Sequence, residues 1–278
     1  MKIIETVAEM QALSTEWRCS GMKVGVVPTM GALHNGHLSL IDIIRAEVDK
    51  IILTIFVNPT QFGENEDLDK YPRTFDADVS ACEEKGVDAI FFPSPEQMYS
   101  ADSSIWVTEE TLSQGLCAAS RPTHFRGVTT VVAKLYNATL PDVAVFGEKD
   151  YQQLQILRRL TRDLNFPIKV IGGPIYREPS GLAMSSRNEY LEPELREKAA
   201  AIYKSLCEAS QKVSSGEFDY HNASKYIAQS ITEAGGRVDY IQIIDSETLK
   251  KLHSVADNAR CLVAAYFGNA RLIDNIAF

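Results

Sequence analysis

Apolar runs alternate with amphipathic segments along the first two thirds of the chain. Five short runs rich in valine, isoleucine and phenylalanine are typical of buried parallel strands: 23–28, 51–57, 87–92, 143–146 and 168–171. Five segments carry apolar residues at helical spacing: 6–19, 38–48, 74–85, 127–138 and 151–165. This alternation predicts a parallel sheet with helices on both faces and right-handed connections. A further short strand is expected at 105–107.

The pattern changes after residue 188. Two long helices are predicted, followed by three strands without long helices between them: 193–213, 220–234, 238–243, 261–267 and 271–276. Gly268 and Asn269 are typical of a hairpin turn between the last two strands. We therefore predict a Rossmann-like, doubly wound α/β domain over 1–176 and a smaller α+β domain over 177–278. The boundary falls in the segment 172–187, which is rich in proline, glycine and serine.

Composition narrows the classes of function. The chain has 278 residues, 45% of them hydrophobic, and a net charge of −9, without a long basic run. Binding to nucleic acid or to an anionic membrane is therefore not favoured. The longest strongly apolar run, 51–57, is too short to cross a membrane, and the start of the chain has no apolar signal core. The five cysteines are scattered and never spaced C-x-x-C, so we expect free thiols in a cytoplasmic protein.

The first predicted strand runs into a glycine-containing turn with two histidines, within the segment 28–40. Helix N-termini present unpaired N–H groups to anions, and Gly31 and Gly36 allow close approach of the backbone. His34 and His37 are spaced i, i+3 and share one face of a first helical turn. A lone histidine is more often packed or solvated. Two at such a turn predict a nucleotide-phosphate site, whereas a metal site lacks a third ligand nearby.

Two polar loops follow later segments. The loop 58–62 contains Gln61, whose amide suits a small hydroxylated acid, although an ordinary polar loop is the simpler interpretation. The loop 121–127 contains Arg121 and a second arginine beside a histidine. It is either a solvated face or a carboxylate site, and the residues leave both interpretations open.

Two more polar segments carry candidate phosphate ligands. In 147–153, Lys149 suits a phosphate, and Asp150 suits Mg²⁺ or a ribose hydroxyl. Asp150 is also a candidate N-cap of the next helix, and both roles are compatible. Gln153 lies one turn further on. In 184–187, two serine hydroxyls and Arg187 suit the β- and γ-phosphates, although a plain domain linker has similar composition.

The order of these segments resembles known nucleotide-binding proteins. The turn 28–40 is similar to the H-x-G-H signature of the nucleotidyltransferase and class I aminoacyl-tRNA synthetase superfamily, and 184–187 to its second signature loop. Five segments together resemble the bacterial pantothenate synthetase (pantoate–β-alanine ligase) family: 56–62, 71–73, 124–128, 146–154 and 184–188. The resemblance covers nearly the whole chain, and no motif position departs from it.

The resemblance implies an AMP-forming ligase of pantothenate and coenzyme A biosynthesis, which condenses (R)-pantoate with β-alanine through a pantoyl adenylate. ATP is then a substrate, and Mg²⁺ is held mainly by phosphates, with Asp150 as the one protein ligand considered. The resemblance also implies a homodimer and a C-terminal domain that acts as a lid. From the charge and composition, we expect no nucleic-acid or membrane partner.

The resemblance also assigns residues. The ATP contacts are Met30, Gly31, Ala32, Leu33, His34, Asn35, Gly36, His37, Gly147, Glu148, Lys149, Asp150, Tyr176, Met184, Ser185, Ser186 and Arg187. The catalytic residues among them are His37, His34 and Lys149. Pantoate is assigned to Gln61 and Gln153, and β-alanine to Gln61, Tyr71 and Arg121.

Two rival functions remain at this point. A nucleotidyltransferase that keeps the nucleotide on its product shares the first signature but has no need of the pair Gln61 and Gln153. A catalytically inactive nucleotide-binding scaffold is the rival from another class. The complete set of histidine, lysine, serine and arginine candidates argues against it.

Overall fold

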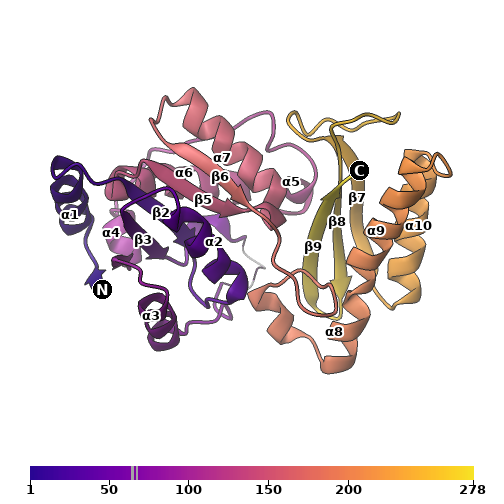
Figure 1. Cartoon of the computed structure of the whole chain (residues 1–278), viewed down its shortest axis with the longest axis horizontal. Coiled ribbons are helices and arrows are strands. Elements are labelled where there is room, and N and C mark those ends of the chain that lie inside the picture. Colours follow the sequence, from indigo (N-terminus) through magenta and orange to yellow (C-terminus); the bar gives the residue numbers. More distant parts are fainter. Residues whose placement is uncertain (64–65, 67) are drawn as a thin grey trace. The chain divides into compact units, whose positions relative to one another are not determined.

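The computed structural model describes residues 1–63, 66 and 68–278, and the chain forms two compact units (Figure 1). The first unit comprises 1–148 and 152–174, and the second comprises 149–151 and 175–278. The second unit thus includes three residues that lie just after a strand of the first. Glu64, Asn65 and Asp67, which follow the segment 58–62, lie outside the described residues.

The first unit contains a six-stranded parallel sheet in the order β1-β4-β3-β2-β5-β6. Its strands are β1 (Lys2–Ile4), β2 (Val24–Thr29), β3 (Lys50–Ile55), β4 (Ala89–Phe91), β5 (Val143–Gly147) and β6 (Lys169–Gly173). β2 lies inside the sheet and pairs with β3 on one side and with β5 on the other. The predicted α/β class with a parallel sheet is confirmed.

Helices cover both faces of this sheet. α1 (Val7–Cys19), α6 (His124–Thr139) and α7 (Tyr151–Asp163) share a core that includes Val26 of β2. α2 (Asn35–Arg45) and α3 (Phe75–Glu84) share the core on the opposite face, which includes Val27. Successive side chains of a strand point to opposite faces, so adjacent apolar residues of β2 supply both cores. This explains why the strand is a continuous apolar run.

The strand order reverses between β2 and β5. From β2 the chain continues through α2 to β3, and β4 lies beyond β3, whereas β5 and β6 lie on the other side of β2. Ligands of doubly wound sheets bind outside the carboxyl ends of the strands at such a reversal. The turn that follows Thr29, the last residue of β2, starts at this point.

The second unit has a three-stranded antiparallel sheet, β7 (Arg237–Asp245), β8 (Ala259–Phe267) and β9 (Ala270–Ala277). Helices α9 (Ala201–Ser214) and α10 (Tyr220–Glu233) pack on this sheet (Figure 1). Their apolar faces form one core with β8, in which Ile202, Ile227 and Val263 are almost fully buried. The predicted α+β unit with a β8–β9 hairpin is confirmed.

The remaining elements are short. They are η1 (Pro59–Gln61), α4 (Pro95–Met98), α5 (Cys117–Ser120), η2 (Glu148–Asp150), η3 (Ser186–Tyr190) and α8 (Pro193–Ala199). Three of them, η1, η2 and η3, contain residues that the sequence assigns to substrate binding.

Four local predictions are wrong. The helix expected over 127–138 begins at His124, so the expected loop 121–127 ends within the first turn of α6. Residues 105–107 are not a strand, because Val107 bonds to helix α6 instead: its N–H donates to Thr130 Oγ1 and its carbonyl accepts from Thr129 Oγ1. The helix expected from residue 38 begins at Asn35, since His34 caps it. The single helix expected over 193–213 is divided into α8 and α9 at Ala200, whose N–H donates to the carbonyl three residues earlier, at 3.2 Å.

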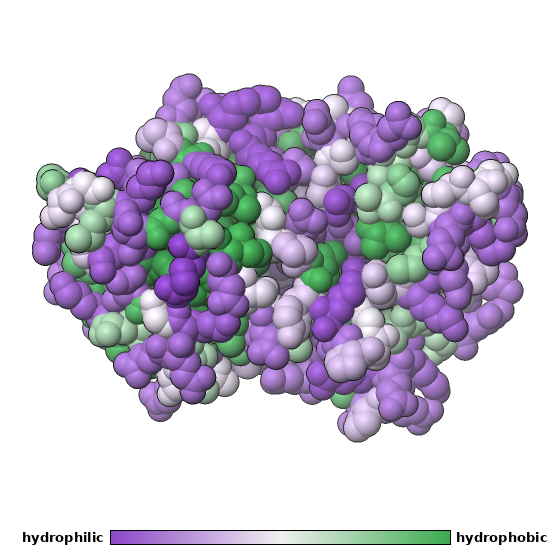
Figure 2. Space-filling model, viewed as in Figure 1, coloured by the Kyte–Doolittle hydropathy of each residue, from purple (hydrophilic) through white to green (hydrophobic). Residues whose placement is uncertain are grey.

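Figure 2 shows one face of the molecule, coloured by hydropathy. On the face in Figure 2, hydrophilic residues predominate and hydrophobic residues show in small groups between them. Among the described residues, no helix combines the length and apolar character needed to cross a membrane.

Candidate active site

The turn after β2 is tied to the neighbouring strand β3. Thr29 Oγ1 donates to the main-chain carbonyl of Thr54 at 2.7 Å and accepts from the Gly31 N–H at 3.1 Å. Gly31 has φ +80° and Ala32 has φ +50°, so two successive residues have left-handed backbone conformations. The chain therefore turns sharply at the strand end before it enters α2.

A buried carboxylate from helix α3 holds this turn. Asp78 is 3% exposed, and its two oxygens accept the N–H groups of Ala32 at 2.9 Å and Leu33 at 2.8 Å. A Cβ atom on Gly31 would lie 3.0 Å from Asp78 Oδ2 and from Ile55 Cγ2, which leaves little room for a side chain. The conformation of the turn is thus set by a residue more than forty positions away in the sequence.

The two histidines lie at the first turn of α2. His34 Nδ1 accepts from the Gly36 N–H at 3.1 Å, and His37 Nδ1 accepts from the His34 N–H at 3.4 Å, which forms a capping box. The two rings stack with centroids 4.1 Å apart. A nitrogen that accepts carries no proton, so the hydrogen-bond network assigns the proton of each neutral ring to Nε2. An Nε2–H group is a donor of the kind that phosphate oxygens accept.

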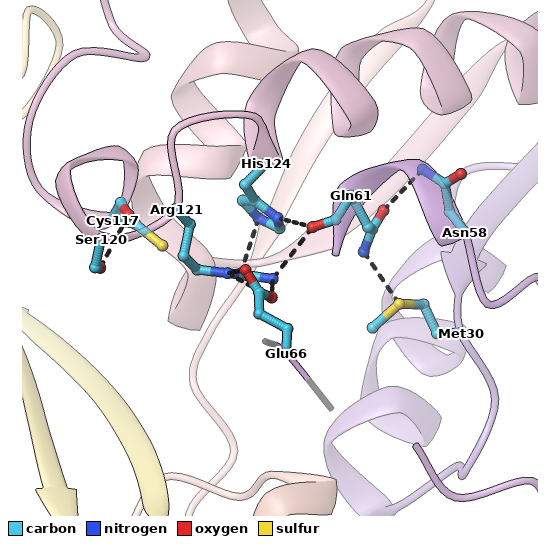
Figure 3. Close-up of polar contacts among 8 residues, drawn as sticks. All are labelled: Met30, Asn58, Gln61, Glu66, Cys117, Ser120, Arg121 and His124. Atoms are coloured by element: carbon cyan, nitrogen blue, oxygen red, sulfur yellow. Dashed lines mark hydrogen bonds and ion pairs between the residues drawn. The ribbon is translucent and has the colours of Figure 1, made fainter. Parts of the chain in front are cut away.

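Gln61 lies in η1 with its side chain held at both ends (Figure 3). Its Oε1 accepts from Asn58 Nδ2 at 3.2 Å, and its Nε2 donates to Met30 Sδ at 3.1 Å. Asn58 is 1% exposed and also donates to the carbonyl of Gly127. Gly127 must be glycine, because a Cβ there would lie 2.4 Å from the carbonyl oxygen of Thr60. The structure therefore brings the predicted residues Met30 and Gln61 into direct contact.

The main chain of Gln61 is held from the other side by the loop before α6. His124 Nδ1 lies 2.9 Å from the Gln61 carbonyl oxygen, and Arg121 Nη2 donates to the same oxygen at 3.3 Å (Figure 3). Arg121 also forms an ion pair with Glu66, with Nε 2.9 Å from both carboxylate oxygens. Burial raises the pKa of Glu66, but the hydrogen bonds and charge of Arg121 outweigh this effect and hold it below its usual value. A substrate carboxylate at Arg121 would therefore compete with Glu66.

Tyr71 and Gln153 occupy different environments. Tyr71 is 5% exposed, and its ring packs edge-on against Phe62. Gln153 is half-buried in the first turn of α7. Its neighbour Gln152 has a structural role, because it donates to the carbonyl of Leu112 and accepts from the Cys117 N–H.

Three residues that follow β5, Lys149, Asp150 and Tyr151, belong to the second unit. The carbonyl of Lys149 accepts from Asn275 Nδ2 at 3.1 Å, and Asn275 accepts in turn from Arg260 Nη1. The guanidinium of Arg260 lies over the ring of Tyr151, whose hydroxyl donates to the carbonyl of Ser246. Side chains of β8 and β9 thus fix the short segment that carries Lys149 and Asp150.

The segment 176–188 forms the other candidate region of the second unit. Tyr176 is 43% exposed and its carbonyl accepts from the Met184 N–H at 2.9 Å, while Ser185 caps η3. Glu178 anchors the segment: it accepts from Asn188 Nδ2 at 2.6 Å and from Arg196 at 2.9 and 3.0 Å. Burial raises the pKa of Glu178. The hydrogen bonds from Arg196 and Asn188 have the larger, opposite effect and hold the pKa below its usual value.

The predicted site residues therefore fall into two groups. The first unit holds Met30, Gly31, Ala32, Leu33, His34, Asn35, Gly36, His37, Gln61, Tyr71, Arg121, Gly147, Glu148 and Gln153. The second unit holds Lys149, Asp150, Tyr176, Met184, Ser185, Ser186 and Arg187. Within the first unit, Met30 contacts Gln61, His34 contacts His37, and Arg121 contacts the Gln61 main chain.

Sequence reasoning did not assign three residues that support this site: Asn58, Asp78 and His124. Asn58 and His124 stand in segments that the motifs include, so their residue type and position gave a signal. Asp78 gave none, because an aspartate in the first turn of a helix is explained by the helix dipole alone.

Comparison with known proteins gives the family. The sequence matches the profile described as pantoate-β-alanine ligase over residues 2–277. The chain belongs to this family. It is 48% identical over 280 residues to the pantothenate synthetase of Sulfurihydrogenibium sp. (strain YO3AOP1), with 100% of both chains covered. It is 49% identical over 276 residues to that of Thermotoga petrophila, with 99% of both chains covered.

Solved structures of family members have the same fold. The pantothenate synthetase of Thermus thermophilus is 42% identical, with a TM-score of 0.93 and 99% of each chain covered. The pantoate-β-alanine ligase of Francisella tularensis is 34% identical, with a TM-score of 0.85, covering 100% of this chain and 97% of that one. The Francisella structure was determined in complex with β-γ ATP and β-alanine. The Rossmann-like fold predicted for this ligase is confirmed.

Proposed function

We propose that this chain is an AMP-forming ligase that condenses (R)-pantoate with β-alanine to give pantothenate, AMP and diphosphate. The observation that carries this function is the family match over residues 2–277, together with full-length relatives near 48% identity. The site geometry agrees with it, since a histidine-bearing helix start lies at the strand-order reversal, where doubly wound sheets bind ligands.

The reaction proceeds in two transfers. A carboxylate oxygen of pantoate attacks the α-phosphorus of ATP, and the bond to diphosphate breaks, which leaves pantoyl adenylate. The β-alanine amine then attacks the acyl carbon, loses a proton, and displaces AMP. Positioning and charge stabilisation dominate the first transfer, because negative charge develops on phosphate oxygens while no proton has to move.

In the first unit, His34 and His37 are assigned to the phosphates of ATP, with His37 as the main catalytic residue. Their Nε2–H groups donate to oxygens whose charge grows during diphosphate departure. The residues 30–36 are also assigned to the nucleotide, although the N–H groups of Ala32 and Leu33 are already bound by Asp78. Gly147 and Glu148 extend the assignment to the exit of β5. The capping box supports these roles, because it fixes both rings on one helix turn.

Gln61 and Gln153 are assigned to pantoate, and Gln61, Tyr71 and Arg121 to β-alanine. The anchoring of Gln61 by Asn58 and Met30 supports a positioning role for its amide. The ion pair with Glu66 means that Arg121 has to share its guanidinium if it binds the β-alanine carboxylate.

In the second unit, Lys149, Asp150, Tyr176 and the segment 184–187 are assigned to ATP. Mg²⁺ suits this assignment: it prefers oxygen ligands and is commonly held by one or two carboxylates plus substrate phosphates. The carboxylate of Asp150 fits that need, because Asp150 is exposed. When bound, the ion neutralises charge on the phosphates. We further propose that the protein acts in the cytoplasm as a homodimer.

Isotope exchange tests this function. With pantoate present and β-alanine absent, labelled diphosphate should appear in ATP; with β-alanine added, free AMP should form in equal amount to pantothenate. Absence of pantoate-dependent exchange would refute the adenylate mechanism. A stable adenylylated product would instead indicate a nucleotidyltransferase.

A further inference from the structure

The carboxylate of Asp78 is buried and belongs to none of the groups assigned to substrates. It lies in the first turn of α3 and is 3% exposed. Its Oδ1 accepts from the Leu33 N–H at 2.8 Å and from Thr74 Oγ1 at 3.1 Å, and its Oδ2 accepts from the Ala32 N–H at 2.9 Å. Both oxygens are therefore used, and two of their three partners are main-chain groups of one turn.

These main-chain groups belong to a turn with an unusual conformation. Gly31 and Ala32 both have positive φ. Ala32, unlike glycine, carries a Cβ atom, and residues with a Cβ seldom adopt this conformation. Successive N–H groups in such a turn form a concave site for an anion. Asp78 occupies that position from within the protein, so the carboxylate stabilises a conformation that few residues adopt unaided.

The turn leads directly into the histidine pair. Leu33, which donates to Asp78, precedes His34, the residue that caps α2 and stacks on His37. A shift of the 31–33 backbone would move the helix start and with it the two imidazoles. Near the reacting atoms, a displacement of about 1 Å lowers rates on the order of 100-fold.

We propose that Asp78 is a positioning residue for adenylate formation, which holds the 31–33 turn so that the His34 and His37 side chains meet the α-phosphate of ATP. The proposal rests on the proposed function. It predicts a defect in the first transfer, in which the phosphate reacts, and not in the use of β-alanine.

The carboxylate can also be reached from a cavity. A cavity of about 540 Å³ at the carboxyl ends of β1, β3 and β4 is lined by Asp78 and Gly31. Its walls are mainly apolar and include the stacked rings of Phe75 and Phe92. If Asp78 is shortened to alanine, a small carboxylate such as formate can enter from this cavity and accept the same two N–H groups.

The first experiment measures pantoate-dependent diphosphate–ATP exchange in Asp78→Ala and Asp78→Asn. We expect both to lower kcat/KM for ATP on the order of 10- to 100-fold, while the KM for β-alanine in the full reaction stays within twofold. Asp76→Ala and Asp76→Asn are the matched controls, because Asp76 is an exposed carboxylate in the first turn of the same helix. They should exchange at the wild-type rate.

The second experiment adds sodium formate to each variant, with sodium chloride at equal ionic strength as the reference. Formate should restore exchange at least threefold in Asp78→Ala, with saturation, and should leave the wild type and Asp76→Ala unchanged. A saturable rescue confined to Asp78→Ala would show that a carboxylate at this position causes the effect, and the separate ATP and β-alanine parameters distinguish positioning from a general loss of structure.

A milder variant covers the case in which Asp78→Ala does not fold. Thr74→Val removes one hydrogen bond to the carboxylate and keeps the other two, so exchange should fall about two- to fivefold. Wild-type rates in Asp78→Asn or Thr74→Val, or an equal loss in the ATP and β-alanine parameters, would overturn the proposal. If the wild type itself shows no exchange, the proposed function has failed, which is a separate outcome.

Discussion

Two segments assigned to ATP each have an acidic side chain that anchors them, but in different ways. In the first unit, Asp78 accepts two main-chain N–H groups of the turn after β2. In the second unit, Glu178 accepts from the side chains of Asn188 and Arg196. The first anchor sets φ and ψ angles within a turn, whereas the second ties the segment 176–188 to helix α8.

We expect the two carboxylates to have different roles, one in catalysis and one in stability. A carboxylate that binds main-chain donors controls where the next residues point, so its loss should affect catalysis first. A carboxylate that binds side chains from another element contributes to cohesion, so its loss should affect stability first. The predictions below test this distinction, from the largest expected effect to the smallest.

The largest loss of activity is expected at His37, in the first turn of α2. His37→Ala should lower the rate of pantoate-dependent exchange on the order of 100-fold or more, because it removes a donor to charge that develops in the transition state. His221→Ala, at an exposed histidine of α10, is the control and should keep the wild-type rate. A loss of less than tenfold in His37→Ala would contradict the assignment.

Lys149→Ala tests the corresponding position in the second unit. We expect a loss on the order of 100-fold in the same exchange assay, because a point charge beside the phosphates is removed. Lys204→Ala, a surface lysine of α9, serves as the control. Should Lys149→Ala exchange as fast as the wild type, the phosphate assignment of Lys149 is wrong.

A smaller and more selective effect is expected at Gln61, which lies in the first unit but outside the turn that Asp78 holds. Gln61→Ala should raise the KM for pantoate and for β-alanine about tenfold or more, while ATP binding measured by calorimetry stays within twofold. Asn58→Ala should show the same pattern more weakly, since Asn58 orients the Gln61 amide. Collapse of ATP binding in Gln61→Ala would show that Gln61 is misassigned.

Loss of Glu178, the anchor in the second unit, should lower the stability of the protein. Glu178→Ala removes the carboxylate partner of Asn188, which is 1% exposed, and should lower the free energy of unfolding by about 1–3 kcal/mol in urea titrations. Glu194→Ala, which breaks a surface pair with Lys198, should leave the unfolding curve nearly unchanged. An equal loss in the two variants would remove the distinction between the anchors.

The smallest effect concerns pH. The pKa of Glu178 lies below its ordinary value of 4.5 in the folded protein, so the unfolded chain binds the proton more tightly. The contribution of Glu178 to stability is therefore present above about pH 4.5 and lost as pH falls through the lowered pKa. The difference in unfolding free energy between wild type and Glu178→Gln should be constant near neutral pH and shrink below pH 4.5. If the difference in unfolding free energy grew as the pH fell, the pKa of Glu178 would not be lowered in the folded protein.

Most elements were predictable because their signals are local. The buried strand β3 is a continuous apolar run, and α7 repeats leucine at helical spacing. The edge strand β1, with only three residues, had no such signal. Residues 105–107 look like a strand by composition, but the main-chain N–H and carbonyl of Val107 bond to threonines of α6, which local sequence does not encode.

In the candidate site, the sequence indicates some residues, whereas only the structure shows the contacts between them. His34, His37 and Gln61 could be named from the sequence, because their residue types and spacing in strand-exit segments indicate phosphate and hydroxy-acid chemistry. The contact of Gln61 with Met30, and the pairing of Arg121 with Glu66, could not be named, since each joins positions far apart in the chain.

The sequence by itself determined the alternation of strands and helices, the glycine turn with its two histidines, and the family resemblance. These properties depend on the order of residues along the chain. The tertiary structure alone decided that the carboxylate of Asp78 lies against the N–H groups of Ala32 and Leu33. Such a contact arises only when α3 packs beside the end of β2. A buried carboxylate is stable there because the turn supplies the donors that water would otherwise provide.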